Sequence, residues 1–332
     1  MPDRTVVIFN RFSHKPLDVR GGATAPGTII QQFQYHGGAN QRWTVRDAGQ
    51  CPVAGGAVAC MFASLSSAGQ AMTMDSSDPA NVKVLQQPLA PTNVFAEDYG
   101  QLWALEELHR SSSRDTRRYV IRNAKDGNVL GLKSESNADG IEVAVGPYQD
   151  KESQRWEILY QLNLQTVDAN DIVVIFSKHS HKCLDVPGST SNDVDIQQYT
   201  YNGGRNQFWS IGTTAFPTVM MPAHAVRALD LKDPSSSDPS VPAGARLQVV
   251  QRAPSGENRQ KWGIHRRPDG DFMIDNAIDP YSVFVGQRGT VFLGAVLDVV
   301  NGTKNDGDSI QLYTPHGGPN QIWEIWVSEP FS

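Results

Sequence analysis

Cysteines are scarce in this sequence, and so are charged residues and long hydrophobic runs. The three cysteines, Cys51, Cys60 and Cys183, match neither a disulfide framework nor the ligand spacing of a zinc site. We therefore expect no metal and no cofactor. Thiols that stay idle in a reducing compartment are the favoured interpretation, and local pairing of Cys51 with Cys60 stays open.

Charge and hydropathy exclude two classes of partner. The 29 lysines and arginines are outnumbered by 35 aspartates and glutamates, so the net charge is −6, and no basic stripe is present. A nucleic-acid-binding segment is normally basic. No apolar run approaches the roughly 20 residues of a membrane span. We expect no nucleic-acid partner and no insertion into a membrane.

The N-terminus and the missing catalytic motifs add two further expectations. The first residues, MPDRTVVIFN, lack the charged-then-apolar layout of a signal peptide, which favours a cytoplasmic location or release by a non-classical route. The chain has no HExxH, no glycine-rich phosphate loop, no GxSxG and no cysteine–histidine set. The sequence therefore predicts a protein that is not an enzyme, with no catalytic residues.

What the sequence does contain is a six-fold Gln-X-Trp motif. Successive tryptophans of the motif lie 60, 53, 53, 53 and 61 residues apart, and of the seven tryptophans only Trp326 lies outside it. The six pairs are Gln41/Trp43, Gln101/Trp103, Gln154/Trp156, Gln207/Trp209, Gln260/Trp262 and Gln321/Trp323. Repetition at a nearly constant period indicates an architecture built from equivalent units, here called the first to sixth repeats.

A longer period divides the chain into two similar halves. The segment IFNRFSHKPLDV at 8–19 matches IFSKHSHKCLDV at 175–186 in eight of twelve positions, a shift of 167 residues. QQFQYHGGANQRW at 31–43 matches QQYTYNGGRNQFW at 197–209 in eight of thirteen positions, a shift of 166. A single ring of six blades would not need this second period. The sequence predicts two domains of three repeats each, at residues 1–162 and 168–332.

Each repeat has the pattern of short strands separated by turns. Runs such as VVIF, PLDV and TIIQQF are bounded by HK, GG and HGGAN, and long amphipathic helical patterns are missing. The predicted fold class is all-β.

Three Gln-X-Trp motifs in each half, with LDV about 25 residues upstream in the best-matched repeats, resemble the ricin B-chain-like, or R-type, lectin family. The resemblance implies two tandem β-trefoils, in which each tryptophan packs in the core and each glutamine holds the backbone by hydrogen bonds. Six large aromatics in equivalent positions are far more often core residues than site residues, which agrees with that role. The tandem layout is also similar to that of a haemagglutinin component associated with clostridial toxins.

The family's sugar pockets need three kinds of side chain. A ring stacks on the apolar face of the sugar, a carboxylate accepts hydrogen bonds from vicinal hydroxyls, and amides donate and accept. The first, fourth and sixth repeats hold the complete set, with seven residues from ring to asparagine and three from ring to the intervening polar residue. The candidate carbohydrate-binding residues are Asp18, Phe33, His36, Asn40 and Gln41; Asp185, Tyr199, Asn202, Asn206 and Gln207; and Asp298, Tyr313, His316, Asn320 and Gln321.

The other three repeats lack parts of the set and are interpreted as scaffold. The second has Asp75, but Pro88 lies about where the ring is expected, and Gly100 replaces the asparagine. The third has Gly131 in place of the acid and Ser153 in place of the asparagine. The fifth keeps Asp230 but has no ring, and Arg259 precedes its glutamine. A lone aspartate or asparagine is often only a turn residue, so joint retention in three repeats is the stronger signal.

These observations favour a multivalent lectin. Family preference, rather than the residues themselves, indicates terminal galactose or N-acetylgalactosamine on glycoproteins, glycolipids or cell surfaces. Two alternatives stay open: a cell-binding subunit of a larger toxin or hydrolase assembly, and a structural or protein-binding trefoil such as an inhibitor. A homodimer and a toxin partner stay open as well.

Overall fold

The computed structural model describes residues 3–50, 58–90, 99–168, 171–212, 218–232, 247–276 and 295–329. Every regular element in these ranges is a β-strand or a three-residue 3₁₀ turn, in agreement with the all-β prediction. No helix among the described residues is long and apolar enough to cross a membrane. Cys51 lies outside the described residues, so its pairing with Cys60 stays an open question.

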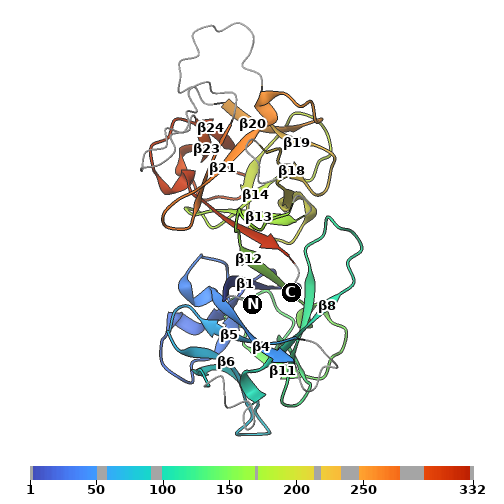
Figure 1. Cartoon of the computed structure of the whole chain (residues 1–332), viewed down its shortest axis with the longest axis vertical. Coiled ribbons are helices and arrows are strands. Elements are labelled where there is room, and N and C mark those ends of the chain that lie inside the picture. Colours follow the sequence, from blue (N-terminus) through green and yellow to red (C-terminus); the bar gives the residue numbers. More distant parts are fainter. Residues whose placement is uncertain are drawn as a thin grey trace, which may run out of the picture. The chain divides into compact units, whose positions relative to one another are not determined.

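The first three repeats each contribute four strands, with a 3₁₀ turn before the fourth (Figure 1). The first repeat has β1 (Arg4–Asn10), β2 (Leu17–Val19), η1 (Arg20–Gly22), β3 (Ile30–Gln32), η2 (Ala39–Gln41) and β4 (Trp43–Gln50). The second has β5 (Val58–Ser64), β6 (Gln70–Asp75), β7 (Lys83–Pro88), η3 (Tyr99–Gln101) and β8 (Trp103–Leu108). The third has β9 (Arg118–Asn123), β10 (Val129–Leu132), β11 (Val143–Gly146), η4 (Glu152–Gln154) and β12 (Trp156–Gln161).

The last three repeats follow the same plan, with one additional short strand in the fourth. The fourth repeat has β13 (Ile172–Ser177), β14 (Cys183–Asp185), β15 (Val194–Asp195), β16 (Gln197–Tyr199), η5 (Arg205–Gln207) and β17 (Trp209–Ser210). The fifth has β18 (Met221–Pro222), β19 (Ala228–Leu231), β20 (Leu247–Arg252), η6 (Asn258–Gln260) and β21 (Trp262–Arg266). The sixth has β22 (Phe272–Asn276), β23 (Val296–Val299), η7 (Val300–Gly302), β24 (Ile310–Tyr313), η8 (Pro319–Gln321) and β25 (Trp323–Ser328).

The chain forms two compact units. One comprises residues 1–111, 116–161 and 328–332, and the other comprises residues 112–115 and 162–327. The exact limits of the two domains, 1–162 and 168–332, stay a prediction.

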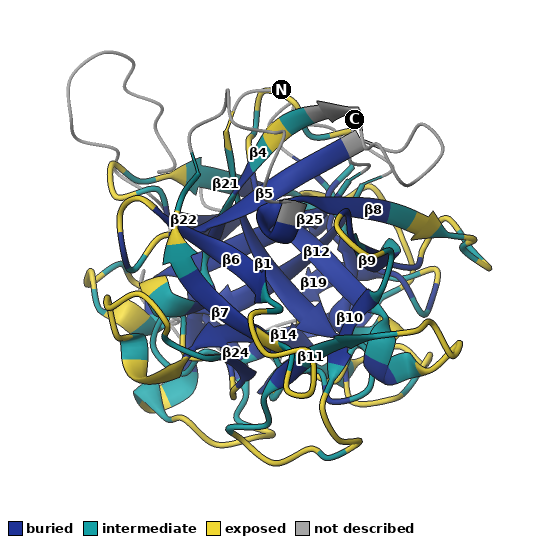
Figure 2. Cartoon of the chain, turned by 90° about the horizontal axis from the view of Figure 1, so that it is seen from below, coloured by how far each residue is buried: buried dark blue, intermediate teal, exposed yellow. Residues whose placement is uncertain are grey.

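The strands form because β-branched and apolar residues dominate them. β1 carries Thr-Val-Val-Ile-Phe and β13 carries Ile-Val-Val-Ile-Phe, residues whose branched side chains pack well on a pleated sheet. Figure 2 shows β1 and β12 almost wholly buried, whereas the connecting loops hold most of the exposed residues. The short strands therefore build the core and leave the loops free to carry function.

The six motif tryptophans lie in the core, as predicted. All six have no exposed surface. Each indole N–H donates to the backbone carbonyl of a residue in the second strand of its own repeat, over 2.9–3.4 Å; the acceptors are Leu17, Met72, Leu130, Leu184, Leu229 and Leu297. A buried indole that also satisfies its polar group fixes the second strand against the fourth.

The motif glutamines clamp a loop, as the family resemblance implied. In the first repeat the Gln41 amide donates to the Gln34 carbonyl at 2.9 Å and accepts from the His36 backbone N–H at 2.9 Å. The same pair of bonds recurs at the other five glutamines: Gln101, Gln154, Gln207, Gln260 and Gln321. This clamp closes the loop between the third and fourth strands in every repeat.

Candidate functional sites

The first repeat brings its predicted acid, histidine and asparagine together. The Asn40 amide donates to Asp18 Oδ2 at 2.7 Å, and His36 Nε2 lies 3.5 Å from the same oxygen. Asn40 also donates to the Val19 carbonyl at 3.2 Å, which fixes the amide at the end of β2. The Phe33 and His36 rings meet edge to face, with centroids 6.1 Å apart.

The sixth repeat reproduces this geometry closely. Asn320 donates to Asp298 Oδ2 at 2.7 Å, and His316 Nε2 lies 3.3 Å from that oxygen. The Tyr313 and His316 rings again meet edge to face, at 6.0 Å.

The fourth repeat keeps the acid–amide pair but has no histidine. Asn206 donates to Asp185 Oδ2 at 2.8 Å and to the Val186 carbonyl at 2.9 Å. Asn202, at the histidine position, uses its side-chain oxygen to accept from the Gly204 backbone N–H at 2.9 Å. This site therefore has no ionisable group beside the acid at that position.

A ring that is at least partly exposed accompanies each acid–amide pair. Phe33 is 36% exposed and Tyr199 is 38% exposed, although large apolar side chains are usually buried. Tyr313 is partly exposed. An aromatic face left in solvent next to fixed polar groups is what stacking of a sugar ring requires.

A further glutamine, which was not among the predicted site residues, completes each site. Antiparallel pairing of the second and third strands sets Asp18 opposite Gln31, Asp185 opposite Gln197 and Asp298 opposite Gln311. Each glutamine amide donates to Oδ1 of its aspartate, at 3.0, 2.7 and 2.8 Å respectively. The available signal was a glutamine two residues before the ring in all three repeats.

The three acids are buried rather than exposed at the surface. Asp18, Asp185 and Asp298 are only 1–2% exposed. Burial raises the pKa of Asp185 to about 6, against the hydrogen bonds from Gln197 and Gln207, which lower it. Burial also raises the pKa of Asp18, while its contacts with Gln31 and His36 act in the opposite direction.

Two adjacent glycines bring the polar groups close together. Gly37, Gly203 and Gly317 have φ of 64°, 65° and 74°, in the left-handed region that glycine adopts readily. The second glycine of each pair has no room for a Cβ atom. In the fourth repeat, a Cβ at Gly204 would lie 2.5 Å from Asn206 Oδ1 and 2.8 Å from Asn202 Oδ1. Gly38 and Gly318 are crowded in the same way by the histidine and asparagine of their own sites.

Gln41, Gln207 and Gln321 differ from the other predicted site residues. They have no exposed surface, and their amides make the loop clamp that also occurs in the second, third and fifth repeats. They hold the pocket loop in place, and the geometry offers no surface at which they would meet a ligand directly.

The second repeat corrects one sequence assignment. Trp103 donates to the Met72 carbonyl, just as Trp43 donates to Leu17, so the residue equivalent to Asp18 is Thr73 and not Asp75. Asp75 accepts from the Ser77 backbone N–H at 3.0 Å, in a turn at the end of β6. In the first repeat Gln41 donates to the carbonyl of Gln34, the residue after the ring of Phe33. In the second repeat Gln101 donates to the Pro88 carbonyl, so the residue equivalent to Phe33 is Gln87 and not the expected Pro88.

The third and fifth repeats depart from the pocket in different ways. In the third, Gly131 takes the acid position, and its strand partner is Ala144. In the fifth, the Arg259 guanidinium lies 3.2 Å from Asp230 Oδ1 and Gln260 donates to Oδ2 at 2.7 Å, so the buried acid is neutralised internally. Arg252 takes the ring position there, because its neighbour Ala253 accepts from Gln260.

Within the described ranges, no group of three histidine, cysteine, aspartate or glutamate side chains has a geometry that could hold a metal ion. The three pockets each centre on one carboxylate with neutral amides, which is a set suited to hydroxyl groups rather than to a cation.

Two sets of three repeats of four or five short strands, with an acid, an amide and a ring brought together in three of the six, fit a tandem β-trefoil of the lectin class. The chain belongs to the ricin-type beta-trefoil lectin domain-like family, whose model matches residues 1–88, 99–199 and 160–245. This membership confirms the resemblance and the predicted fold, and it assigns the chain to carbohydrate binding as a class of function.

Solved structures with similar folds include toxins and lectins. A mosquitocidal holotoxin is 19% identical with a TM-score of 0.41, over 100% of this chain and 35% of that chain. The hemolytic lectin CEL-III is 15% identical with a TM-score of 0.39, over 97% of this chain and 63% of that one. The ricin B-like lectin of Macrolepiota procera, solved in complex with lactose, is 19% identical with a TM-score of 0.37, over 50% of this chain and 99% of that one.

The chain thus spans about a third of the holotoxin and less than two thirds of the hemolytic lectin. Membership of the family is shown by the family match alone. No curated protein matches the sequence.

Proposed function

We propose that the protein is a non-catalytic, multivalent lectin that binds terminal galactose or N-acetylgalactosamine through the pockets of the first, fourth and sixth repeats. One observation carries the proposal. In these three repeats an exposed ring stands beside a buried carboxylate whose oxygens are held by two amides, and the second, third and fifth repeats each lack the ring and the asparagine.

The chemistry of each pocket suits a neutral sugar. The ring offers an apolar face for the C–H side of the pyranose. An ionised carboxylate can accept about four hydrogen bonds, more than the two amides donate, so capacity is left for vicinal hydroxyls. The amide of Asn40, Asn206 or Asn320 adds a donor and an acceptor at the pocket wall. The choice of galactose follows family preference and not these contacts.

Multivalency would make such pockets effective. A single shallow site is expected to bind near the millimolar range, or roughly −4 kcal/mol. Three sites on one chain raise the avidity for a glycan-coated surface by about 10²–10⁴. The natural partners would then be glycoproteins, glycolipids or cell surfaces that present several copies of the sugar.

Catalysis is not part of the proposal. Hydrolysis of a glycosidic bond needs two carboxyl groups about 5–10 Å apart. Each pocket is built around one aspartate, and that aspartate already accepts hydrogen bonds from two amides.

The test replaces the rings, because they support little packing. The triple variant Phe33→Ala, Tyr199→Ala, Tyr313→Ala should fold normally and fail to bind galactose-coated resin. Tyr148→Ala is the matched control, since Tyr148 is 37% exposed and lies outside the three pockets. It should be retained like the wild type, and calorimetric titration of the wild type should count two or three sites per chain.

Three outcomes would redirect the proposal. Retention of the triple variant, with its fold verified by circular dichroism, would mean that other surfaces bind the sugar. Absence of any signal for the wild type on a glycan array would favour the protein-binding trefoil. Binding by the wild type together with capture of a separate catalytic chain would support the targeting-subunit alternative.

A further inference from the structure

The polar residue between the ring and the asparagine divides the three predicted pockets into two kinds. In the first and sixth repeats it is a histidine, His36 or His316, whereas in the fourth repeat it is Asn202. The other predicted residues of the fourth and sixth pockets are of the same types: Asp185 and Asp298, Tyr199 and Tyr313, Asn206 and Asn320, Gln207 and Gln321. A difference in what these two pockets bind is therefore expected from this position.

Histidine and asparagine share one role in the turn that follows. The Gly318 backbone N–H donates to His316 Nδ1 at 3.1 Å, and the Gly204 backbone N–H donates to Asn202 Oδ1 at 2.9 Å. Each side chain therefore satisfies the equivalent backbone group of its own repeat. Exchange of one residue type for the other should leave this turn intact.

Only the histidine has a second polar atom that reaches the acid. Because His316 Nδ1 accepts a hydrogen bond, the neutral ring carries its proton on Nε2. This Nε2 donates to Asp298 Oδ2 at 3.3 Å, and in the first repeat His36 Nε2 lies 3.5 Å from Asp18 Oδ2. In the fourth repeat the asparagine is shorter, and its side-chain oxygen is used in the turn. The histidine is thus an additional donor to the acid in two of the three pockets.

The imidazole is restrained from several sides. Besides the bond to the turn and the contact with the acid, the His316 ring meets the Tyr313 ring edge to face, with centroids 6.0 Å apart. His36 meets Phe33 in the same way at 6.1 Å. Aromatic pairs in this arrangement are stabilised beyond the burial of their surfaces. The histidine therefore stays beside the acid when a sugar stacks on the neighbouring ring.

The histidine uses part of the accepting capacity of its acid. A carboxylate has about four positions at which it can accept a hydrogen bond. Asp298 accepts from two amides and from the imidazole, which leaves about one position. Asp185 accepts from the two equivalent amides, which leaves about two. The motif glutamines approach the acids of the first and fourth repeats alike, so they do not change this difference.

We propose that His36 and His316 are specificity-determining residues that limit the acid of their pockets to one sugar hydroxyl, whereas the acid of the fourth pocket accepts from two vicinal hydroxyls. The inference rests on the proposed function, because it requires the three pockets to bind a galactoside. The first and sixth pockets then take sugars in which one hydroxyl of the vicinal pair is missing or substituted. The fourth pocket requires the intact pair.

The experiment titrates the ¹⁵N-labelled full chain with methyl galactoside and with its 2-deoxy, 3-deoxy and 4-deoxy analogues at pH 8, where Asp185 is ionised. The backbone amide signals of Gly38, Gly204 and Gly318 report the three pockets separately. At Gly204 the analogues of two adjacent positions should bind about tenfold or more weakly than the parent sugar, because each has lost a hydrogen bond to a charged group. At Gly38 and Gly318 only one analogue should bind that weakly. The remaining analogues should stay within about fivefold of the parent, since they lose at most a neutral hydrogen bond.

Reciprocal exchanges test the residue itself. His316→Asn should make the sixth pocket require two adjacent hydroxyls, and Asn202→His should make the fourth pocket require one. A residue with only a structural role in the turn would not change this pattern. His109→Asn is the matched control, because His109 is exposed and lies outside the three pockets, and it should leave all three patterns unchanged. Circular dichroism verifies the fold of each variant.

The outcomes separate this inference from the proposed function. The role of the histidines is overturned if the wild-type pockets all bind the parent sugar with one and the same pattern. It is also overturned if a folded exchange variant keeps the pattern of the wild type. Failure of the parent galactoside to shift any of the three glycine signals would overturn the proposed function together with this inference.

Discussion

Replacement of Asp185 by alanine tests the fourth-repeat site and the energetics of its buried acid together. The pKa of Asp185 is raised from 3.8 to about 6 because burial disfavours the charged carboxylate. At about 1.4 kcal/mol per pKa unit, the ionised acid costs the folded state about 3 kcal/mol relative to its protonated form. Ionisation of this buried acid therefore opposes folding at neutral pH.

The substitution removes this burden but leaves two amides without an acceptor. Gln197 and Asn206 donate to Asp185 at 2.7 and 2.8 Å. An unsatisfied buried donor costs about 1–3 kcal/mol. The two effects oppose each other, so at pH 8 the free energy of unfolding of Asp185→Ala should differ from that of the wild type by less than about 2 kcal/mol, while sugar binding at this site is lost.

The direction of this pKa shift decides how the stability of the protein changes with pH. A folded-state pKa above the unfolded value means that the native state binds more protons between pH 3.8 and about 6. The stabilising contribution of protonated Asp185 is therefore fully present below pH 3.8 and is lost as the pH rises through about 6. Between pH 8 and pH 5 the wild type should regain about 1.4 kcal/mol relative to the variant.

Urea unfolding of both proteins at pH 5 and pH 8 measures this difference, since other titrating groups cancel between them. Calorimetric titration with a galactoside at pH 8 should count one site fewer in the variant. In the wild type the same site should weaken as the pH falls through about 6, because a protonated acid accepts fewer hydrogen bonds from hydroxyls. An unchanged site count, or a stability difference that does not vary with pH, would refute this account of Asp185.

Three further predictions follow from the scaffold and the pockets. Trp156→Ala should lower the free energy of unfolding of the first unit by about 3–5 kcal/mol in denaturant titrations; full stability with lost sugar binding would contradict its assignment to the core. Gly204→Ala should displace Asn206, whose Oδ1 would lie 2.5 Å from the new Cβ, and weaken the fourth-repeat site about tenfold by calorimetry, whereas Gly140→Ala should not alter binding there. The purified protein should not hydrolyse a chromogenic galactoside, and turnover that scales with protein concentration would disprove the binding-only function.

Much of the fold could be predicted from the sequence because its evidence is periodic. The Gln-X-Trp motif recurs wherever a tryptophan must fill the core and a glutamine must clamp the same loop, and both roles are seen in all six repeats. The acid, ring and asparagine could be located for a related reason. Their spacing is set by one hairpin and one turn, and those local structures are repeated in the first, fourth and sixth repeats.

Other features were decided only by the tertiary structure. Which residue of the second repeat replaces Asp18 depends on strand register, and the contact between Trp103 and Met72 selects Thr73 over the more conspicuous Asp75. A linear pattern does not show register, because any offset of two residues keeps side chains on the same face of a strand.

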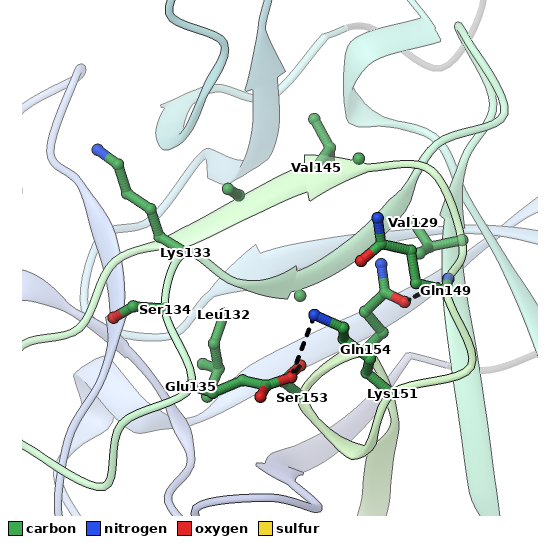
Figure 3. A pocket seen from close by; sticks show the side chains of 13 residues that line it. Val129, Leu132, Lys133, Ser134, Glu135, Val145, Gln149, Lys151, Ser153 and Gln154 are labelled. Carbon is green, nitrogen blue, oxygen red and sulfur yellow. Dashed lines mark hydrogen bonds and ion pairs between the residues drawn. The ribbon is translucent and has the colours of Figure 1, made fainter.

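The partners of the acids and the shape of the third repeat depend on the same kind of long-range information. Gln31 meets Asp18 only because β2 and β3 pair, although thirteen residues separate them in the chain. In the third repeat a hollow of about 420 Å³ is lined by Gly131, Ala144 and Gly146, among others (Figure 3). Absence of an acid looks like loss of function in the sequence. In the structure the position of the missing acid borders open space, because the volume between strands is set by the side chains of all of them at once.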